Sequence, residues 1–202
     1  PEAWSLRWYR QMVGISSIGD TTVVSNKWML GTRNSFIIGI IATLLATALG
    51  TVAALGLSRP HMPFKPVLMA ILISPMIVPL IITAAGMFFF YSKVGLTHTY
   101  LGLILAHTAL GTPFVVITVT ATLTGFDTNL IRASQSLGAD TMKTFFKIIM
   151  PLILPGVISG GLFAFITSFD EVVIVMFVGS VEQITIPKQM WAGLRQETSP
   201  VI

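Results

Sequence analysis

The chain has 202 residues, of which 53% are hydrophobic and only 10% are charged. An ordinary soluble domain carries roughly a quarter charged residues, so the composition excludes that class and indicates a membrane protein. The formal charge of +4 is dispersed along the chain, which argues against nucleic acid as a partner, and the absence of cysteine excludes disulfides and thiolate metal sites.

Residues 1–33 are interpreted as an extracytoplasmic or interfacial segment. Amphipathic aromatic rings of the kind that settle at the depth of lipid headgroups recur in it, namely Trp4, Trp8, Tyr9 and Trp28. The chain starts at Pro1 and stops where new apolar sequence begins. We therefore expect a fragment of a longer protein, with further membrane segments beyond both ends.

Four apolar stretches follow, at about 35–57, 66–91, 99–123 and 148–178. Each is long enough for the roughly 20 helical residues that a bilayer core requires. They predict an all-α membrane protein, a polytopic helical bundle with four full transmembrane helices in one domain over residues 34–202.

The first two stretches carry features that predict their packing. Small residues recur at every fourth position of the first, a spacing that lets another helix approach closely: Ala42, Ala46, Gly50 and Ala54. The second holds Pro75 and Pro79, each of which removes a backbone donor, so this helix should be kinked or opened. The bend has two open interpretations, a lining of the translocation pathway or a packing kink.

The polar interruption at 127–151 is longer than a connector needs to be. Two short amphipathic helices are predicted in it, hinged at Gly138, with Asp140 placed to cap the second. The faces spaced at i, i+3, i+4 and i+7 are Leu130, Ala133, Ser134 and Leu137 in the first helix, and Met142, Phe145, Phe146 and Ile149 in the second. Such a structured loop is built for a partner to grip.

The fourth stretch begins near Pro151 and leads to an acidic pair, Asp170 and Glu171. About 28 Å of helix separates Pro151 from Asp170, which places the pair well across the membrane. Ionisable groups there are costly, so the functional interpretation is a substrate pathway. The alternative is that one carboxylate caps or pairs locally.

No phosphate-binding loop and no nucleophile grouping occurs in the chain, and its three histidines lack ligand spacing. We therefore expect neither an enzyme nor a metal site nor a cofactor, and energy for uphill transport has to come from another chain. A secondary transporter, which also uses broken helices and buried carboxylates, and a non-transporting membrane scaffold are the alternatives from other classes.

One set of residues in the interruption matches a known signature in order and spacing: Ala133, Ser134, Gly138, Ile148, Met150 and Pro151. It resembles the Glu-Ala-Ala…Gly…Ile-x-Leu-Pro signature of permease subunits in binding-protein-dependent ABC importers. The chain departs from that pattern at three positions, with Arg132 for Glu, Ser134 for the second Ala and Met150 for Leu. The runs at 5–9, 168–174 and 186–200 resemble the spermidine/putrescine-type branch.

The resemblance implies a permease of six helices, a dimer of cytoplasmic ABC ATPases, a second homologous permease subunit and an extracytoplasmic solute-binding protein, in a bacterial inner membrane. It also places loop 127–151 in the cytoplasm, although Lys and Arg divide five to seven between the two sides against the positive-inside rule. The ATPase-coupling residues that it implies are Leu130, Arg132, Ala133, Ser134, Leu137, Gly138, Ala139, Asp140, Phe145, Phe146 and Pro151.

One feature of the sequence bears on the identity of the transported solute. An acidic pair in a desolvated pathway suits a cationic polyamine, whose ammonium groups need compensation. Other solutes that such permeases serve, such as an opine, an amino acid derivative, a metal or an oxyanion, are the alternatives. The candidate pathway residues are Pro75, Pro79, Asp170 and Glu171.

Overall fold

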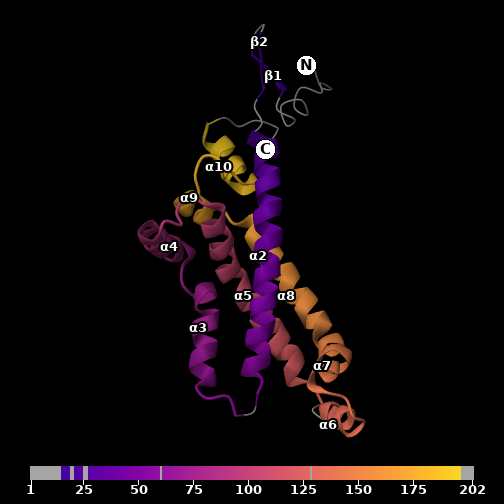
Figure 1. Ribbon diagram of the computed structural model, residues 1–202. Coiled ribbons are helices and arrows are strands. Elements are labelled where there is room, and N and C mark those ends of the chain that lie inside the picture. The colour runs from indigo at the N-terminus through magenta and orange to yellow at the C-terminus, as the bar shows by residue number, and fades with distance from the viewer. Residues whose placement is uncertain (1–14, 19–20, 25–26, 60, 128, 197–202) are drawn as a thin grey trace. The chain divides into compact units, whose positions relative to one another are not determined.

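A computed structural model describes residues 15–18, 21–24, 27–59, 61–127 and 129–196 (Figure 1). An antiparallel hairpin, β1 (Ile15–Ile18) and β2 (Thr21–Val24), precedes a succession of helices. The helices are α2 (Lys27–Leu57), α3 (Lys65–Ile77), α4 (Leu80–Val94), α5 (Tyr100–Thr124), α6 (Asn129–Ser136), α7 (Thr141–Thr144), the π-helix η1 (Phe145–Ile149), α8 (Met150–Asp170), α9 (Val173–Val178) and α10 (Ile186–Gln196). Most of the predicted interfacial segment, including Trp4, Trp8 and Tyr9, lies outside the described residues.

Three described helical segments are long and apolar enough to cross a membrane: α2, α5 and the run Thr141–Asp170. The pair α3 and α4 makes a fourth if it is one broken span. The prediction of an all-α polytopic membrane protein is therefore confirmed.

The helix boundaries differ from the predicted ones in three places. The first helix already begins at Lys27, and the stretch 66–91 is two helices, bent at a break at Val78 and Pro79. The fourth helix ends at Asp170, and the residues up to 178 form the separate helix α9. Hydropathy alone does not locate the break at Val78 and Pro79, because apolar residues continue through it, whereas the break between α8 and α9 falls at the acidic residue Glu171 and at Val172.

Backbone chemistry explains why the chain opens near the prolines. Pro75 has no N–H for the carbonyl of Ile71, one turn earlier, and the hydroxyl of Ser74 donates to that carbonyl instead, at 2.7 Å. The helix thus passes Pro75 and ends at Ile77. Pro79 then stands directly before α4, where its missing N–H leaves nothing unsatisfied.

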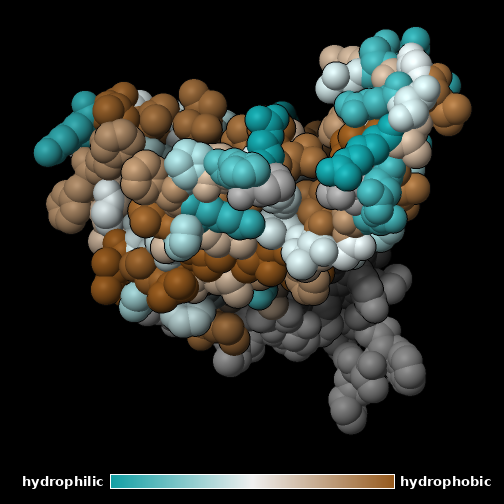
Figure 2. Space-filling view, turned by 90° about the horizontal axis from the view of Figure 1, so that it is seen from below, coloured by the Kyte–Doolittle hydropathy of each residue, from teal (hydrophilic) through white to brown (hydrophobic). Residues whose placement is uncertain are grey.

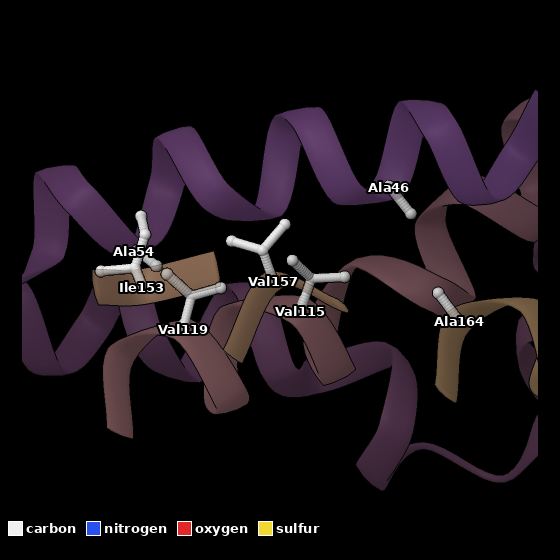
Figure 3. Packing of buried hydrophobic residues seen from close by; sticks show 7 residues of the cluster. All are labelled: Ala46, Ala54, Val115, Val119, Ile153, Val157 and Ala164. Atoms are coloured by element: carbon white, nitrogen blue, oxygen red, sulfur yellow. The ribbon is translucent and has the colours of Figure 1, made fainter. Parts of the chain in front are cut away.

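The described residues pack into two compact units, one drawn from residues 1–41, 79–107 and 169–202 and the other from residues 42–78 and 108–168. The core of the second unit joins α2, α5 and α8, whose side chains point toward one another in Figure 3. Its members are Ala46, Ala54, Val115, Val119, Ile153, Val157 and Ala164.

Small residues make this core possible. A Cβ atom added at Gly50 would lie 2.7 Å from Cβ of Val115, and one at Gly160 would lie 2.7 Å from Cα of the same valine. Ala42, Ala46 and Ala54 are buried on the same ridge as Gly50. The ridge predicted in the first span is therefore a packing surface within the chain.

In the first unit, α4 packs against α9, with Ala84, Tyr91, Ile174 and Val178 among the buried residues. A buried asparagine near the start of α2 holds the segment after α9. Nδ2 of Asn34 donates to the carbonyls of Glu182 and Ile184 at 3.0 and 2.9 Å, and Oδ1 accepts from the Tyr100 hydroxyl at 3.0 Å.

Candidate functional site

The interruption between α5 and α8 forms a tight helical corner. Oδ1 of Asp127 accepts from the backbone N–H of Asn129 at 2.9 Å as α6 begins. At the far end Gly138 adopts φ +79°, while Ala139 N–H donates to Ser134 O and Gly138 N–H to Gln135 O, both at 3.0 Å. This pair of bonds is the Schellman pattern that ends a helix on a left-handed residue, so the predicted turn at Gly138 is present.

The helix after the turn is capped as predicted. Oδ1 of Asp140 accepts from the backbone N–H of Lys143 at 2.7 Å, and the other carboxylate oxygen lies 3.5 Å from the Lys143 ammonium. Both side chains are exposed, so the backbone hydrogen bond rather than the ion pair fixes the start of α7.

A pair of buried hydroxyls joins α6 to α7. Oγ of Ser134 lies 2.8 Å from Oγ1 of Thr144, and both residues are less than 7% exposed. Ser134 was expected on the apolar face of its helix. It does face inward, but its role there is polar, since it also lies 2.9 Å from the Ile131 carbonyl.

The connection from this corner into α8 is a widened helical turn. Met150 N–H bonds to the carbonyl of Phe145, five residues earlier, and the π-helix Phe145–Ile149 ends just before Pro151. Proline cannot donate to the carbonyl four residues before it, so α-helical bonding would fail at this place in any case. The helical run from Thr141 to Asp170 nevertheless stays unbroken.

Large apolar side chains of the corner face outward. Leu137 is 88% exposed, Met142 67% and Phe146 62%. Leu130, Ala133 and Arg132 are also exposed, whereas Ala139 and Phe145 are half-buried and Pro151 is exposed at the start of α8. Of the predicted face of the first helix, only Ser134 is buried. Figure 1 draws α6 and α7 at one end of α8, and the view from below in Figure 2 shows hydrophobic and hydrophilic groups interspersed.

A cavity of about 390 Å³ lies behind this surface, between α6, α7, η1 and the ends of α2 and α5. Its walls are mostly apolar, with a few polar groups and one guanidinium. The lining residues are Leu55, Ser58, Arg59, Leu123, Phe126, Ile131, Gln135, Thr141, Thr144, Phe145 and Ile149.

The two acidic residues have different environments. Asp170 is exposed at the end of α8, whereas Glu171 is 7% exposed and its Oε1 accepts from the backbone N–H of Ile174 at 3.0 Å. Glu171 therefore makes the local capping contact that the sequence left open as an alternative. Of the two prolines, Pro75 is half-buried within α3 and Pro79 is exposed before α4.

Sequence reasoning missed Thr144 and Lys188. The Lys188 ammonium donates to the carbonyls of Val175 at 3.2 Å and Ser180 at 3.0 Å, and burial lowers the pKa of this ammonium below its usual 10.5. One signal was available, since a basic residue in the first turn of a helix opposes the helix dipole and suggests a contact elsewhere. Among the described residues, no group of three or more His, Asp or Glu could hold a metal ion.

The family described as "Binding-protein-dependent transport system inner membrane component" matches residues 46–201. The chain belongs to this family. Its members are inner-membrane components of transport systems, and the membrane location expected from the sequence is confirmed.

Two relatives align over almost the whole chain. The spermidine/putrescine transport system permease protein PotC of Haemophilus influenzae is 28% identical over 201 residues, which are 100% of this chain and 74% of that protein. The putrescine transport system permease protein PotI of Escherichia coli K12 is 29% identical over 208 residues, which are 98% of this chain and 70% of that protein.

A solved structure confirms the fold. It is that of a bacterial ABC transporter involved in the import of the acidic polysaccharide alginate, with a TM-score of 0.69 and 14% identity over 96% of this chain and 75% of that chain. At this identity the likeness shows the fold alone, which is that of an ABC transporter permease.

Proposed function

We propose that this chain is the transmembrane permease subunit of an ATP-driven importer and helps to form the pathway for a small cationic solute, a polyamine or a similar compound. The observation that carries the proposal is the α6–α7 corner. It displays Leu137, Met142 and Phe146 on helices fixed by a glycine turn and a buried hydroxyl pair. The match to a family of inner-membrane components of transport systems supports a role in transport.

The exposed side chains suit docking into a cleft of a cytoplasmic ATPase. Full burial of one large apolar side chain is worth about 1.5–3 kcal/mol, so three of them form an adequate centre for an interface. The whole proposed coupling surface consists of Leu130, Arg132, Ala133, Ser134, Leu137, Gly138, Ala139, Asp140, Phe145, Phe146 and Pro151. Met142 is added to it because of its exposure.

The continuity of the helical run gives the surface a mechanical connection. The run from Thr141 to Asp170 has no break, so a pull on α7 moves α8 as well. Closure of an ATPase dimer would displace the corner, and α8 would carry that displacement into the membrane as rigid-body rocking, which alternates access.

The cargo assignment is supported by the two relatives whose names specify spermidine or putrescine transport. Asp170 is an exposed carboxylate at the end of a membrane-spanning helix, and it could compensate an ammonium group of a polyamine on its path. Pro75 and Pro79, which interrupt the second span, are further residues proposed for the substrate pathway.

The complete importer would contain two copies of the ATPase, a second homologous permease subunit and an extracytoplasmic solute-binding protein in the lipid bilayer. Loop 127–151 would then face the cytoplasm. In this proposal the ATPase hydrolyses ATP and so provides the energy for transport, and the permease subunit itself is not an enzyme.

The test is uptake of labelled spermidine or putrescine into proteoliposomes that contain the purified complex and trapped ATP. Leu137→Glu should abolish retention of the ATPase and ATP-dependent uptake. Val181→Glu changes an apolar side chain that is 81% exposed in the other unit, and it serves as the matched control for ATPase retention. Uptake driven by an ion gradient without ATP would show a secondary transporter and overturn the proposal.

A further inference from the structure

The short helix α9 is held at both ends by charged side chains from outside it. At its N-terminal end Oε1 of Glu171 accepts from the backbone N–H of Ile174 at 3.0 Å. At its C-terminal end the Lys188 ammonium donates to the carbonyls of Val175 and Ser180. A carboxylate at the start of a helix and an ammonium at its end both complement the helix dipole.

A helix of six residues needs such support. Isolated helices shorter than about 12 residues are marginal, because few hydrogen bonds compensate the cost of ordering the first turn. The side chains of α9 add packing on one face only, where Ile174, Val175 and Val178 are buried. The face that carries Met176 and Phe177 lines a cavity of about 410 Å³ together with Ala85, Phe88 and Phe89 of α4.

The contacts of Glu171 also limit what else it can do. The residue is 7% exposed, and one carboxylate oxygen is already engaged by a backbone amide. A cargo ammonium would have to reach a buried group and compete with a bond that orders the first turn of α9. Its neighbour Asp170 is exposed and has no such restriction.

We propose that Glu171 and Lys188 are positioning residues that order α9, the helix that packs against α4, and that Glu171 is not a ligand for the transported solute. This inference rests on the proposed permease function for its uptake readout. The ordering of α9 against α4 can be measured without any transport, so the two proposals can fail separately.

The first arm compares neutral substitutions of Glu171. Gln keeps an oxygen that accepts from Ile174 N–H but removes the charge, whereas Leu removes the acceptor and the charge together. Uptake turnover should stay within about twofold of wild type in Glu171→Gln and fall about tenfold in Glu171→Leu, because the Leu variant leaves a buried backbone amide without its acceptor. Glu182→Gln, an exposed carboxylate of the same unit, is the matched control. If Glu171→Gln loses as much uptake as Glu171→Leu while α9 stays ordered against α4, the charge binds cargo and the proposal is wrong.

The second arm measures the α4–α9 pair directly in the assembled complex. The chain contains no cysteine, so Phe89→Cys and Met176→Cys, both at exposed positions, can carry a pair of spin labels on an otherwise native sequence. The distance distribution between the labels should broaden in Glu171→Leu and Lys188→Met. It should stay narrow in Glu171→Gln and Lys188→Arg, which keep an acceptor and a donor, respectively.

An unchanged distribution in both Glu171→Leu and Lys188→Met would overturn the proposal, whatever happens to uptake. If the wild-type complex transports no polyamine while these variants still broaden the distribution, the proposed cargo is wrong and the positioning role stands. If one of the two disruptive variants fails to assemble, the other one supplies the test, because Glu171→Leu and Lys188→Met are both expected to broaden the distribution.

Discussion

The hydroxyl of Thr144 in α7 lies 2.8 Å from that of Ser134 in α6, and this contact joins the two helices that flank the turn at Gly138. A hydroxyl has one hydrogen, and Ser134 donates its own to the Ile131 carbonyl at 2.9 Å, so Thr144 is the donor between the two side chains. In the signature that this chain resembles, an alanine stands at the position of Ser134, and its side chain has no oxygen to accept this hydrogen bond.

Removing either hydroxyl should destabilise the corner. Ser134→Ala leaves Thr144 without this acceptor, and Thr144→Val removes the donor, and each should lower the free energy of unfolding by about 1 kcal/mol. The double variant should cost less than the sum of the two, because no unpaired hydroxyl remains in it. Chemical unfolding of the purified subunit in detergent measures all three, and strictly additive costs would argue against the bond.

Gly138 should tolerate residues according to their backbone preference rather than their size. Its φ is +79°, yet a Cβ atom would meet nothing within 4 Å. Gly138→Val should cost about 1–2 kcal/mol through left-handed strain and reduce uptake per ATP hydrolysed. Gly138→Asn, which tolerates this conformation, should retain most coupling. Equal defects in both variants would mean that contacts with a partner, not the turn, decide the effect.

Substitution at Gly160, in contrast, should be restricted by the space around its Cα atom and not by its backbone conformation. A Cβ atom there would lie 2.7 Å from Cα of Val115, a backbone atom that cannot turn aside. Gly160→Ala should destabilise the protein by about 1–3 kcal/mol. Gly86→Ala in α4 is the matched control, since a Cβ there meets nothing within 4 Å. Thermal unfolding should show a drop of about 2–4 °C per kcal/mol for the first and none for the second.

Lys188 should make stability depend on pH. Burial lowers the pKa of its ammonium in the folded protein below 10.5, so in the interval between the lowered pKa and 10.5 the unfolded chain binds more protons. Its contribution to the free energy of unfolding therefore rises as pH rises through that interval. The melting temperature of wild type relative to Lys188→Met should increase between neutral and alkaline pH. A constant difference would show that the group titrates normally.

The sequence predicted those elements that depend on local chemistry. Hydropathy identified the membrane-spanning stretches, the i+4 spacing of Ala42, Ala46 and Ala54 identified a packing ridge, and Gly138 with Asp140 identified the turn and cap. Each of these signals lies within one element and needs no partner from elsewhere in the chain.

The remaining features depend on contacts between elements. The outward direction of Leu130 and Leu137 follows from how α6 meets α7, which the apolar spacing alone does not specify. The capping role of Glu171 needed the start of α9, and the role of Lys188 needed carbonyls at residues 175 and 180. The periodicity of a sequence does not predict such contacts, because it contains no information on which residues far away in the chain lie next to a polar side chain.

Asn34 imposes an order of events on synthesis. Its side-chain amide donates to Glu182 and Ile184, and the first of these lies 148 residues later in the chain. At translation rates of about 5–20 residues per second, the ribosome needs roughly 7–30 s to add that length. During this interval the amide at the start of the first long helix has neither of its final acceptors. The hydrogen bonds of Asn34 with Glu182 and Ile184 therefore form only after the segment that follows α9 has been synthesised.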